Sequence, residues 1–216
     1  MHPQSKEMEF NDKQIQIIES AERLFADKGF DGTSVREIAK HSNVNLAMIS
    51  YYFGSKEKLM EAIFNYRINN SMFAVKSVVD DKSLSPLKKI EALIDSVIDK
   101  ISEKECFHRI MVRQQVVAKD DVVTKLMNES RLRNIELLNG IIREGQALKL
   151  FKKKVDTPLL IITMIGTIYQ MMNTQDFYRK AHKLEAMEES AFQAHIKRVL
   201  RIHIKKLFKT ILNNEA

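Results

Sequence analysis

The chain contains 216 residues with no Trp, three Pro and six Gly, and this composition predicts an all-α protein with a small and a larger helical domain. Its single cysteine, Cys106, excludes an internal disulfide. The net charge of +7 does not by itself indicate nucleic-acid binding. Residues 1–70 contain nine Lys or Arg and ten Asp or Glu, a net of −1, so the remaining +8 lies downstream.

A first amphipathic helix is predicted from Asn11 to Lys28. Asn11 and Gln14 can form a capping box at its start, and Gly29 can end it. Its apolar face consists of residues at helical spacing: Ile15, Ile18, Ala21, Leu24 and Phe25. We expect this helix to brace the two helices that follow.

Residues 33–57 then predict two short helices joined by a tight turn, the layout of a DNA-reading helix-turn-helix. Ser34 and Glu37 can form a capping box for the first of these helices. The Ser42-Asn43 pair ends that helix.

The second helix of this pair is predicted over Leu46 to Phe53, with Asn45 as its cap and Val44 packed between the two helices. Its narrow buried stripe needs only Ile49 and Phe53. The residues left facing outward are Leu46, Ala47, Met48, Ser50 and Tyr51. Apolar atoms can meet thymine methyls in a major groove and hydroxyls can reach bases or phosphates, so this face suits DNA.

After this unit, Gly54 can take a left-handed turn and Ser55 can cap a fourth helix. That helix is expected to add four apolar side chains to the same small core: Leu59, Met60, Ile63 and Phe64. The four helices predict a compact N-terminal head.

The head carries a set of short motifs in a fixed order: Ala21–Phe25, Gly29-Phe30, Thr33-Ser34, Ile38-Ala39, Val44 and Tyr52–Glu57. Together they resemble the TetR/AcrR-type transcriptional regulators. The chain departs from that family at Ser50, where the family usually has Tyr, and Tyr51 becomes the candidate for the phosphate contact of that position. The resemblance implies a DNA-binding domain at residues 11–71, with the helix-turn-helix at 34–53, and a helical effector-binding and dimerisation domain at residues 72–216.

On this hypothesis, Thr33 and Ser34 hold a phosphate of double-stranded DNA at a helix N-terminus, and Arg36 reaches phosphate or a guanine edge. Lys56 clamps phosphate at the start of the fourth helix, and Tyr52 packs its ring while its hydroxyl reaches outward. The full set of candidate DNA-binding residues is Thr33, Ser34, Arg36, Asn45, Leu46, Ala47, Met48, Ser50, Tyr51, Tyr52 and Lys56. Plain helix capping also accounts for Thr33, Ser34 and Asn45.

Downstream, helices are separated by breaks at residues 81–86, 119–121, 149–158 and 173–176. Ser85-Pro86 and Thr157-Pro158 each read as an N-cap followed by proline at the first helical position. The helix after Pro158 is apolar almost all round but too short to span a bilayer. The last helix, within residues 187–212, has a predicted apolar stripe of Phe192, Ile196, Val199, Leu200, Leu207 and Phe208.

The family resemblance implies that these last two long helices pair with the same helices of a second subunit. An isologous homodimer would present two heads to successive major grooves, and its operator would be near-palindromic. Ordinary packing within one chain is the alternative for either helix alone.

A partly apolar small-molecule effector is expected in the C-terminal domain, because Met adapts its shape and Tyr offers a polar handle. The candidate pocket residues are Phe107, Met111, Met164, Tyr169, Met171 and Met172. Each of them also fits a filled core. An effector that prefers wrongly spaced heads would lower operator affinity, which describes an inducible repressor.

No catalytic residue, metal site or cofactor is expected. The six histidines lack the spacing of a helical zinc motif, and no Gly-rich phosphate loop or nucleophile elbow occurs. We expect a cytoplasmic protein without a signal segment or membrane partner. Two alternatives stay open: an activator on the same fold, and a helical ligand-binding or membrane-surface protein whose basic C-terminal helix docks on anionic lipid.

Overall fold

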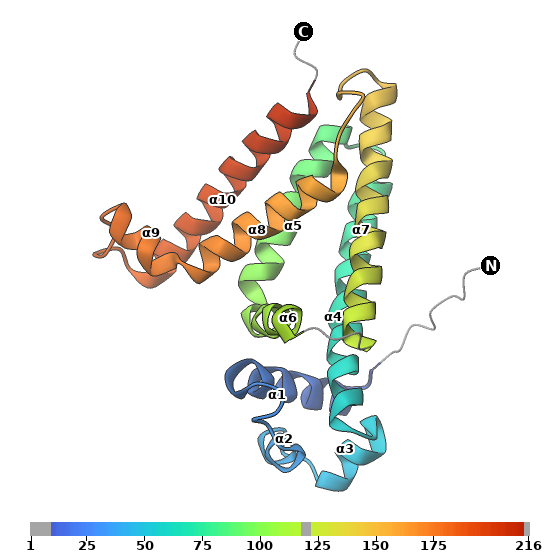
Figure 1. The fold of residues 1–216 in the computed structure, drawn as a ribbon, viewed down its shortest axis with the longest axis vertical. Coiled ribbons are helices and arrows are strands. Elements are labelled where there is room, and N and C mark those ends of the chain that lie inside the picture. The colour runs from blue at the N-terminus through green and yellow to red at the C-terminus, as the bar shows by residue number, and fades with distance from the viewer. Residues whose placement is uncertain (1–9, 118–121, 214–216) are drawn as a thin grey trace, which may run out of the picture. The chain divides into compact units, whose positions relative to one another are not determined.

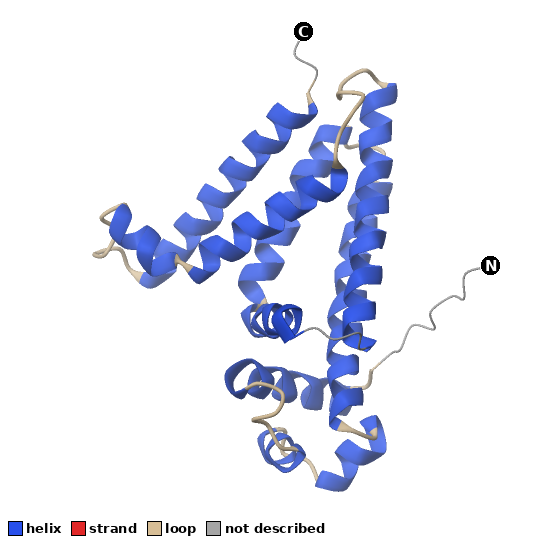
Figure 2. Cartoon of the chain, in the orientation of Figure 1, coloured by secondary structure: helices blue, strands red, loops and turns tan. Residues whose placement is uncertain are grey.

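The computed structural model describes residues 10–117 and 122–213, which are helical apart from turns, loops and one isolated antiparallel bridge between Phe151 and Asn213 (Figure 2). The helices of these residues, labelled in Figure 1, are α1 (Asp12–Lys28), α2 (Val35–His41), α3 (Leu46–Phe53), α4 (Lys56–Asp80), α5 (Pro86–Glu103), α6 (Glu105–Val117), α7 (Val122–Ala147), α8 (Thr157–Asn173), α9 (Gln175–Ala181) and α10 (Glu189–Leu212). The predicted all-α class is therefore confirmed. The break expected at residues 119–121 lies outside the described residues.

The chain divides into two compact units. Unit one combines the described residues up to Phe73 with Lys104–Arg131, and unit two combines Ala74–Glu103 with the described residues from Leu132 onward. This division differs from the boundary predicted between residues 71 and 72, because unit one takes in a second segment of the chain. The division by function stays a prediction.

The hydrophobic core of unit one draws on helices that are far apart in the sequence. The fully buried side chains of its first four helices include Ile17, Ile18, Phe25, Ile38, Ile49, Leu59, Ile63 and Phe64. Helix α6 packs against α1 and adds Phe107 and Ile110 to the same core. The ring centroid of Phe107 lies 5.1 Å from that of Phe64 in an edge-on contact. The small head expected from residues 11–71 is thus completed by α6.

Local caps place the helices of unit one where the sequence predicts them. The capping box of Asn11 and Gln14 is complete, with both hydrogen bonds at 3.0 Å. Gly29 ends α1 with a φ of 80°, a backbone conformation that favours glycine. The Ser34 hydroxyl accepts the Glu37 N–H at 3.2 Å, but the Glu37 carboxylate pairs with Lys28. The capping box predicted for α2 is therefore only half formed.

A buried ion pair joins α1 to α4. The guanidinium of Arg67 donates from Nε to Glu22 Oε2 at 2.7 Å and from a terminal nitrogen to Glu22 Oε1 at 3.1 Å. The two side chains are 11% and 6% exposed. Two parallel hydrogen bonds in a site with little water fix the direction of α4 against α1.

Replacing Arg67 with Met should leave the Glu22 carboxylate buried without its partner. We expect the free energy of unfolding to fall by about 3 kcal/mol, the usual cost of breaking a buried ion pair from one side. Chemical denaturation measures this change, with Arg36→Met as the exposed control. Equal effects of the two substitutions would contradict the structural role of the pair.

In unit two, α5 packs along α10, and α8 packs against both. The buried face of α10 repeats every four residues: Phe192, Ile196, Leu200, Ile204, Phe208 and Leu212. Four residues of the stripe predicted for this helix lie on that buried face, and the other two, Val199 and Leu207, are half-buried. Within residues 10–117 and 122–213, every helix is too short or too polar to span a bilayer.

Ion pairs line the edge between α5 and α10. Lys205 Nζ lies 2.6 Å from Asp95 Oδ2, and Arg201 contacts both Asp95 and Asp99. Part of the basic run at the end of the chain is therefore neutralised inside unit two. Lys206 and Lys209 of the same run are exposed.

The two proline-started helices differ in their caps. At α5 the Ser85 hydroxyl accepts the Lys88 N–H at 3.4 Å, as predicted. At α8 the cap is Asp156, whose side chain accepts the Leu159 N–H at 3.0 Å. Thr157 was wrongly predicted as this cap, because its hydroxyl is buried and donates to Asn139 Oδ1 at 2.6 Å.

Candidate nucleic-acid interface

The turn between α2 and α3 is held by hydrogen bonds to α2 and to α1. The buried Ser42 hydroxyl donates to the Ile38 carbonyl at 2.7 Å, and the Val44 N–H donates to the Ala39 carbonyl at 3.0 Å. Gln16 of α1 donates its amide to the Ser42 carbonyl at 2.9 Å. Sequence reasoning missed Gln16, because no local pattern links residues 26 positions apart. These bonds fix the crossing of α2 and α3.

Helix α3 separates its side chains sharply into an inner and an outer set. Ile49 and Phe53 are 2% and 8% exposed, which confirms the predicted buried pair. On the outer side Leu46 is 39% exposed and Tyr51 84% exposed. Ala47 and Ser50 are also exposed, whereas Met48 and Tyr52 are half-buried. The Asn45 side chain accepts the Ala47 N–H at 3.0 Å and so caps the helix.

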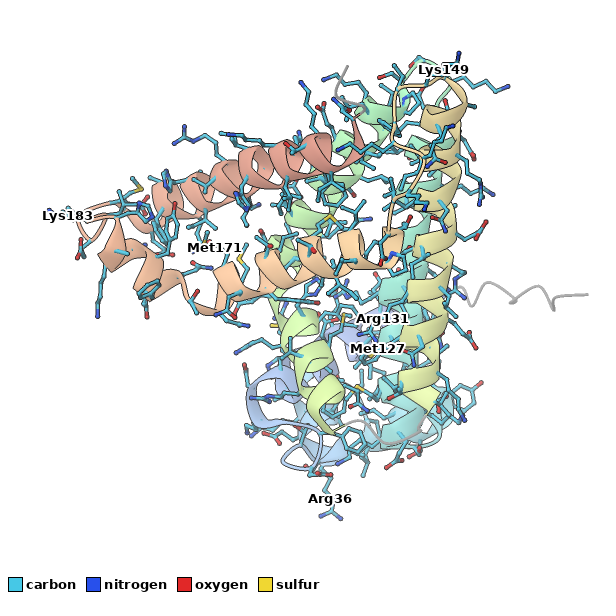
Figure 3. All side chains as sticks on the ribbon, turned by 45° about the horizontal axis from the view of Figure 1, so that its top comes forward. Arg36, Met127, Arg131, Lys149, Met171 and Lys183 are labelled. Atoms are coloured by element: carbon cyan, nitrogen blue, oxygen red, sulfur yellow. The ribbon has the colours of Figure 1, made fainter. Side chains whose placement is uncertain are left out.

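Helix α2 supplies exposed cations beside α3. Arg36 points away from the ribbon in Figure 3, and among the described residues it makes no hydrogen bond or ion pair. Lys40 is also exposed. A guanidinium that is not engaged within the protein can bind a phosphate without first breaking an internal contact.

Thr33 has a different role from the predicted phosphate contact. The residue is 1% exposed, and its hydroxyl lies 2.8 Å from the Gly29 carbonyl and 3.2 Å from the Leu24 carbonyl. A hydroxyl with its donor used on the end of α1 cannot also reach solvent. Thr33 therefore anchors the start of α2 to the end of α1.

Lys56 is likewise engaged within the protein. Its ammonium donates to the carbonyls of Phe30 at 2.8 Å and Thr33 at 3.0 Å, and it lies 4.3 Å from the centroid of the Phe30 ring. These contacts use two of its three N–H donors. Lys56 thus holds the segment between α1 and α2, and one donor is left for a phosphate.

Two carboxylates near this face have pKa values below the ordinary value of Glu. The hydrogen bond from Lys28 is the main cause that lowers the pKa of Glu37 below its ordinary value. The Ser55 hydroxyl is the main cause that lowers the pKa of Glu57. Because Glu37 of α2 is paired with Lys28 of α1, its charge does not offset the exposed cations of α2, Arg36 and Lys40.

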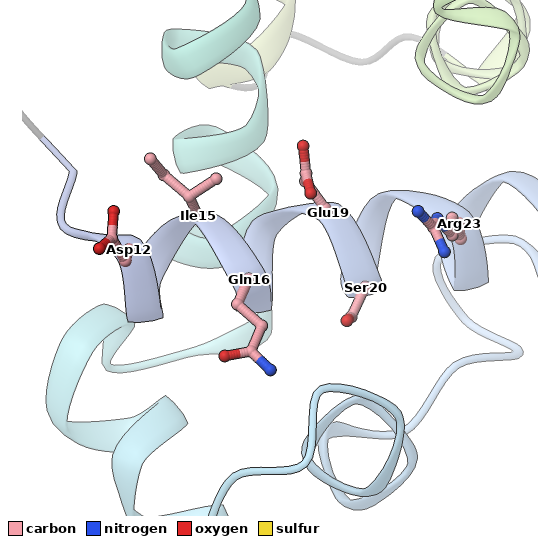
Figure 4. Close-up of a pocket in the computed structure, with 6 residues that line it drawn as sticks. All are labelled: Asp12, Ile15, Gln16, Glu19, Ser20 and Arg23. Atoms are coloured by element: carbon pink, nitrogen blue, oxygen red, sulfur yellow. The ribbon is translucent and has the colours of Figure 1, made fainter.

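The six predicted pocket residues do not belong to one core. Phe107 and Met111 pack in the core of unit one, whereas the other four pack in the core of unit two: Met164, Tyr169, Met171 and Met172. A depression of about 340 Å³ lies on the surface of α1 (Figure 4). Its lining residues are Asp12, Ile15, Gln16, Glu19, Ser20 and Arg23, and none of the predicted pocket residues is among them.

The part of the chain that the structure describes holds no group of three or more His, Cys, Asp or Glu side chains placed to bind a metal ion. The surface of α2 and α3 presents exposed apolar groups, hydroxyls and the cations Arg36 and Lys40.

Comparison with known proteins finds relatives of this arrangement. Residues 17–63 match the family described as bacterial regulatory proteins, tetR family. The probable HTH-type transcriptional regulator YttP of Bacillus subtilis is 35% identical over 133 residues, covering 60% of this chain and 63% of that protein. The fatty acid metabolism regulator protein of the same organism is 24% identical over 181 residues, covering 84% of this chain and 92% of that protein.

Solved structures show the same fold. The ketosteroid transcriptional regulator KstR2 of Mycobacterium tuberculosis has a TM-score of 0.70 at 17% identity, covering 96% of this chain and 98% of that chain. The fatty acid degradation regulator FadR from Bacillus halodurans has a TM-score of 0.67 at 20% identity, covering 91% and 96%. The likeness to the tetR family of bacterial regulatory proteins rests on residues 17–63 and on these relatives. It spans about three fifths of the length of the first two curated relatives, 63% and 62%.

The structural role of Lys56 can be tested by a substitution that removes its charge and keeps a side chain of similar length. Lys56→Met loses two hydrogen bonds to carbonyls, and we expect the free energy of unfolding to fall by about 1.5 to 3 kcal/mol, as for hydrogen bonds to a charged group. Lys58→Met is the matched control, since Lys58 is 62% exposed and pairs with Glu61 on the same helix. Its expected change is below about 0.5 kcal/mol. Equal losses in urea denaturation would show that Lys56 does not anchor this segment.

Proposed function

We propose that the protein is a sequence-specific DNA-binding transcriptional regulator. The observation that carries the proposal is the outer face of α3, where exposed Leu46, Ala47, Ser50 and Tyr51 stand beside the exposed Arg36 of α2. Arg36 contacts phosphate, and α3 enters the major groove with its first turn toward the bases. The family match and the names of the relatives support this proposal.

In the proposed contact, each predicted residue acts from the position described above. Ser34 faces phosphate while it caps α2, and Asn45 faces the groove while it caps α3. Tyr51 makes the phosphate contact that a Tyr at position 50 makes in the family. Met48 and Tyr52 contact DNA from the half-buried edge of α3. Thr33 contributes only as an anchor.

The protein is proposed to repress transcription when no effector is bound. The relative KstR2 of Mycolicibacterium smegmatis is named a transcriptional repressor, and IcaR of Staphylococcus epidermidis is named a negative transcriptional regulator. A repressor of this kind releases DNA when its effector binds more tightly to a conformation in which the two N-terminal heads are wrongly spaced for the operator. An activator on the same fold would differ only in where its operator lies relative to the promoter.

A homodimer through α8 and α10 is part of the proposal. Leu159 and Ile162 of α8 are 57% and 65% exposed, and Ile202 of α10 is 60% exposed. Large apolar side chains exposed on neighbouring helices favour burial against a second subunit. Two heads related by a twofold axis would read a near-palindromic operator.

The effector is proposed to be a partly apolar small molecule. One relative is named for fatty acid metabolism, and one similar solved structure is named for ketosteroids. Fatty acids and ketosteroids are both partly apolar small molecules. In unit two, Met164, Tyr169, Met171 and Met172 of α8 stay candidates for its contacts. A regulator that acts on bacterial DNA would work in the cytoplasm and would need no membrane partner.

Selection from a randomised duplex library at fixed salt tests the proposed function. We expect the protein to enrich a palindrome and the double variant Arg36→Ala, Tyr51→Ala to lose that enrichment, because both exposed contacts are removed. Circular dichroism of the variant serves as the control for folding. Equal enrichment by the variant would exclude this face as the DNA-reading surface, and a library without any enriched sequence would favour the ligand-carrier or lipid-surface alternative.

A further inference from the structure

The outer surface of α3 carries no charged side chain. The helix reads LAMISYYF, and its exposed members are Leu46, Ala47, Ser50 and Tyr51. Residues 46 and 50, like residues 47 and 51, are four positions apart and so share a face of the helix. One continuous strip of methyl, methylene, hydroxyl and phenol groups is presented to a binding partner.

This chemistry limits which bases α3 can read. Guanine is read chiefly by Arg or Lys, adenine by Asn or Gln, and cytosine by Asp or Glu, whereas the C5 methyl of thymine is read by apolar side chains. Helix α3 contains none of the first three kinds of side chain. Asn45, directly before it, uses its side-chain oxygen to accept the Ala47 N–H at 3.0 Å. The apolar contact with thymine is the readout that its first turn can make.

The neighbouring charges favour DNA over a protein surface as the partner of this strip. Arg36 and Lys40 of α2 are exposed on the helix that precedes α3, and a row of phosphates borders every major groove. In a helix-turn-helix the first helix crosses the backbone, so these cations position the protein while α3 reads the bases.

We propose that the operator carries thymine in each half-site beneath the first turn of α3, and that Leu46 and Ala47 recognise the C5 methyl groups of these bases. The inference rests on the proposed DNA-binding function and adds the base that the site selects. Ser50, one turn later, contributes a hydroxyl contact that tolerates several bases, and Tyr51 makes its proposed phosphate contact.

Replacing thymine with uracil removes one methyl group and leaves base pairing intact. The enriched duplex is therefore resynthesised with uracil at each thymine of the half-site in turn, and binding is measured at one salt concentration. At least one position per half-site should lose about fourfold in affinity, the value for one buried methyl or methylene group. Uracil outside the half-site is the control and should change nothing.

The Leu46→Ala variant identifies the side chain that makes the contact. Because Leu46 is 39% exposed, the substitution should leave the fold intact, and thermal unfolding checks this. For this variant, uracil at the sensitive position should cost less than about twofold, since the two groups interact directly. Arg36→Ala should keep the full uracil penalty, because its contact is with the backbone.

An enriched palindrome without thymine in the half-site would overturn the thymine inference and leave DNA binding standing. The same conclusion follows if uracil costs the same in the parent protein and in Leu46→Ala and Ala47→Gly. If no sequence is enriched, the proposed function fails together with the inference.

Discussion

The segment that leads into α2, a helix proposed to contact DNA, is held by one ammonium group. Lys56, at the start of α4, donates to the carbonyls of Phe30 and Thr33 and lies over the Phe30 ring. These carbonyls belong to the short segment between α1 and α2, where the Phe30 carbonyl also accepts the Thr33 N–H at 3.3 Å. By holding that segment, Lys56 determines where Ser34 begins α2 and therefore where Arg36 points.

The rest of unit one is tied to α1 by polar contacts between segments distant in the sequence. Gln16 holds the turn before α3, and Glu22 holds Arg67 of α4. At the end of α1, the Phe25 carbonyl accepts a hydrogen bond from Arg113 of α6 at 3.3 Å. Each contact lies beside a hydrophobic core that alone would permit small rotations of the helices. The polar contacts select one arrangement, which a base-reading surface requires.

Features of the fold set by close neighbours in the chain could be predicted from the sequence. The caps at Asn11, Ser34 and Asn45 involve partners two or three residues away. The buried pair of α3 was predicted correctly, and so was its outer face except for Met48, which is half-buried. Gly54 was also predicted correctly, with a φ of 77°. Such features follow from local stereochemistry and helical periodicity.

The remaining features depend on packing between distant segments, which periodicity does not encode. Thr33 looked like a helix cap open to phosphate, but the end of α1 covers it. Asp156 and Thr157 are both residue types that cap helices well. The Thr157 hydroxyl donates to Asn139 instead, and Asp156 caps α8. The predicted pocket residues share a chemical type but belong to two cores.

The central claim is that α2 holds the DNA backbone while α3 reads the bases. The dependence of operator affinity on salt concentration separates these two roles, because only phosphate contacts release counterions. Arg36→Ala should reduce the slope of log affinity against log salt by about 1, whereas Leu46→Ala should weaken binding at every salt concentration with the slope unchanged. An unchanged slope for Arg36→Ala, or a reduced slope for Leu46→Ala, would contradict this division of roles.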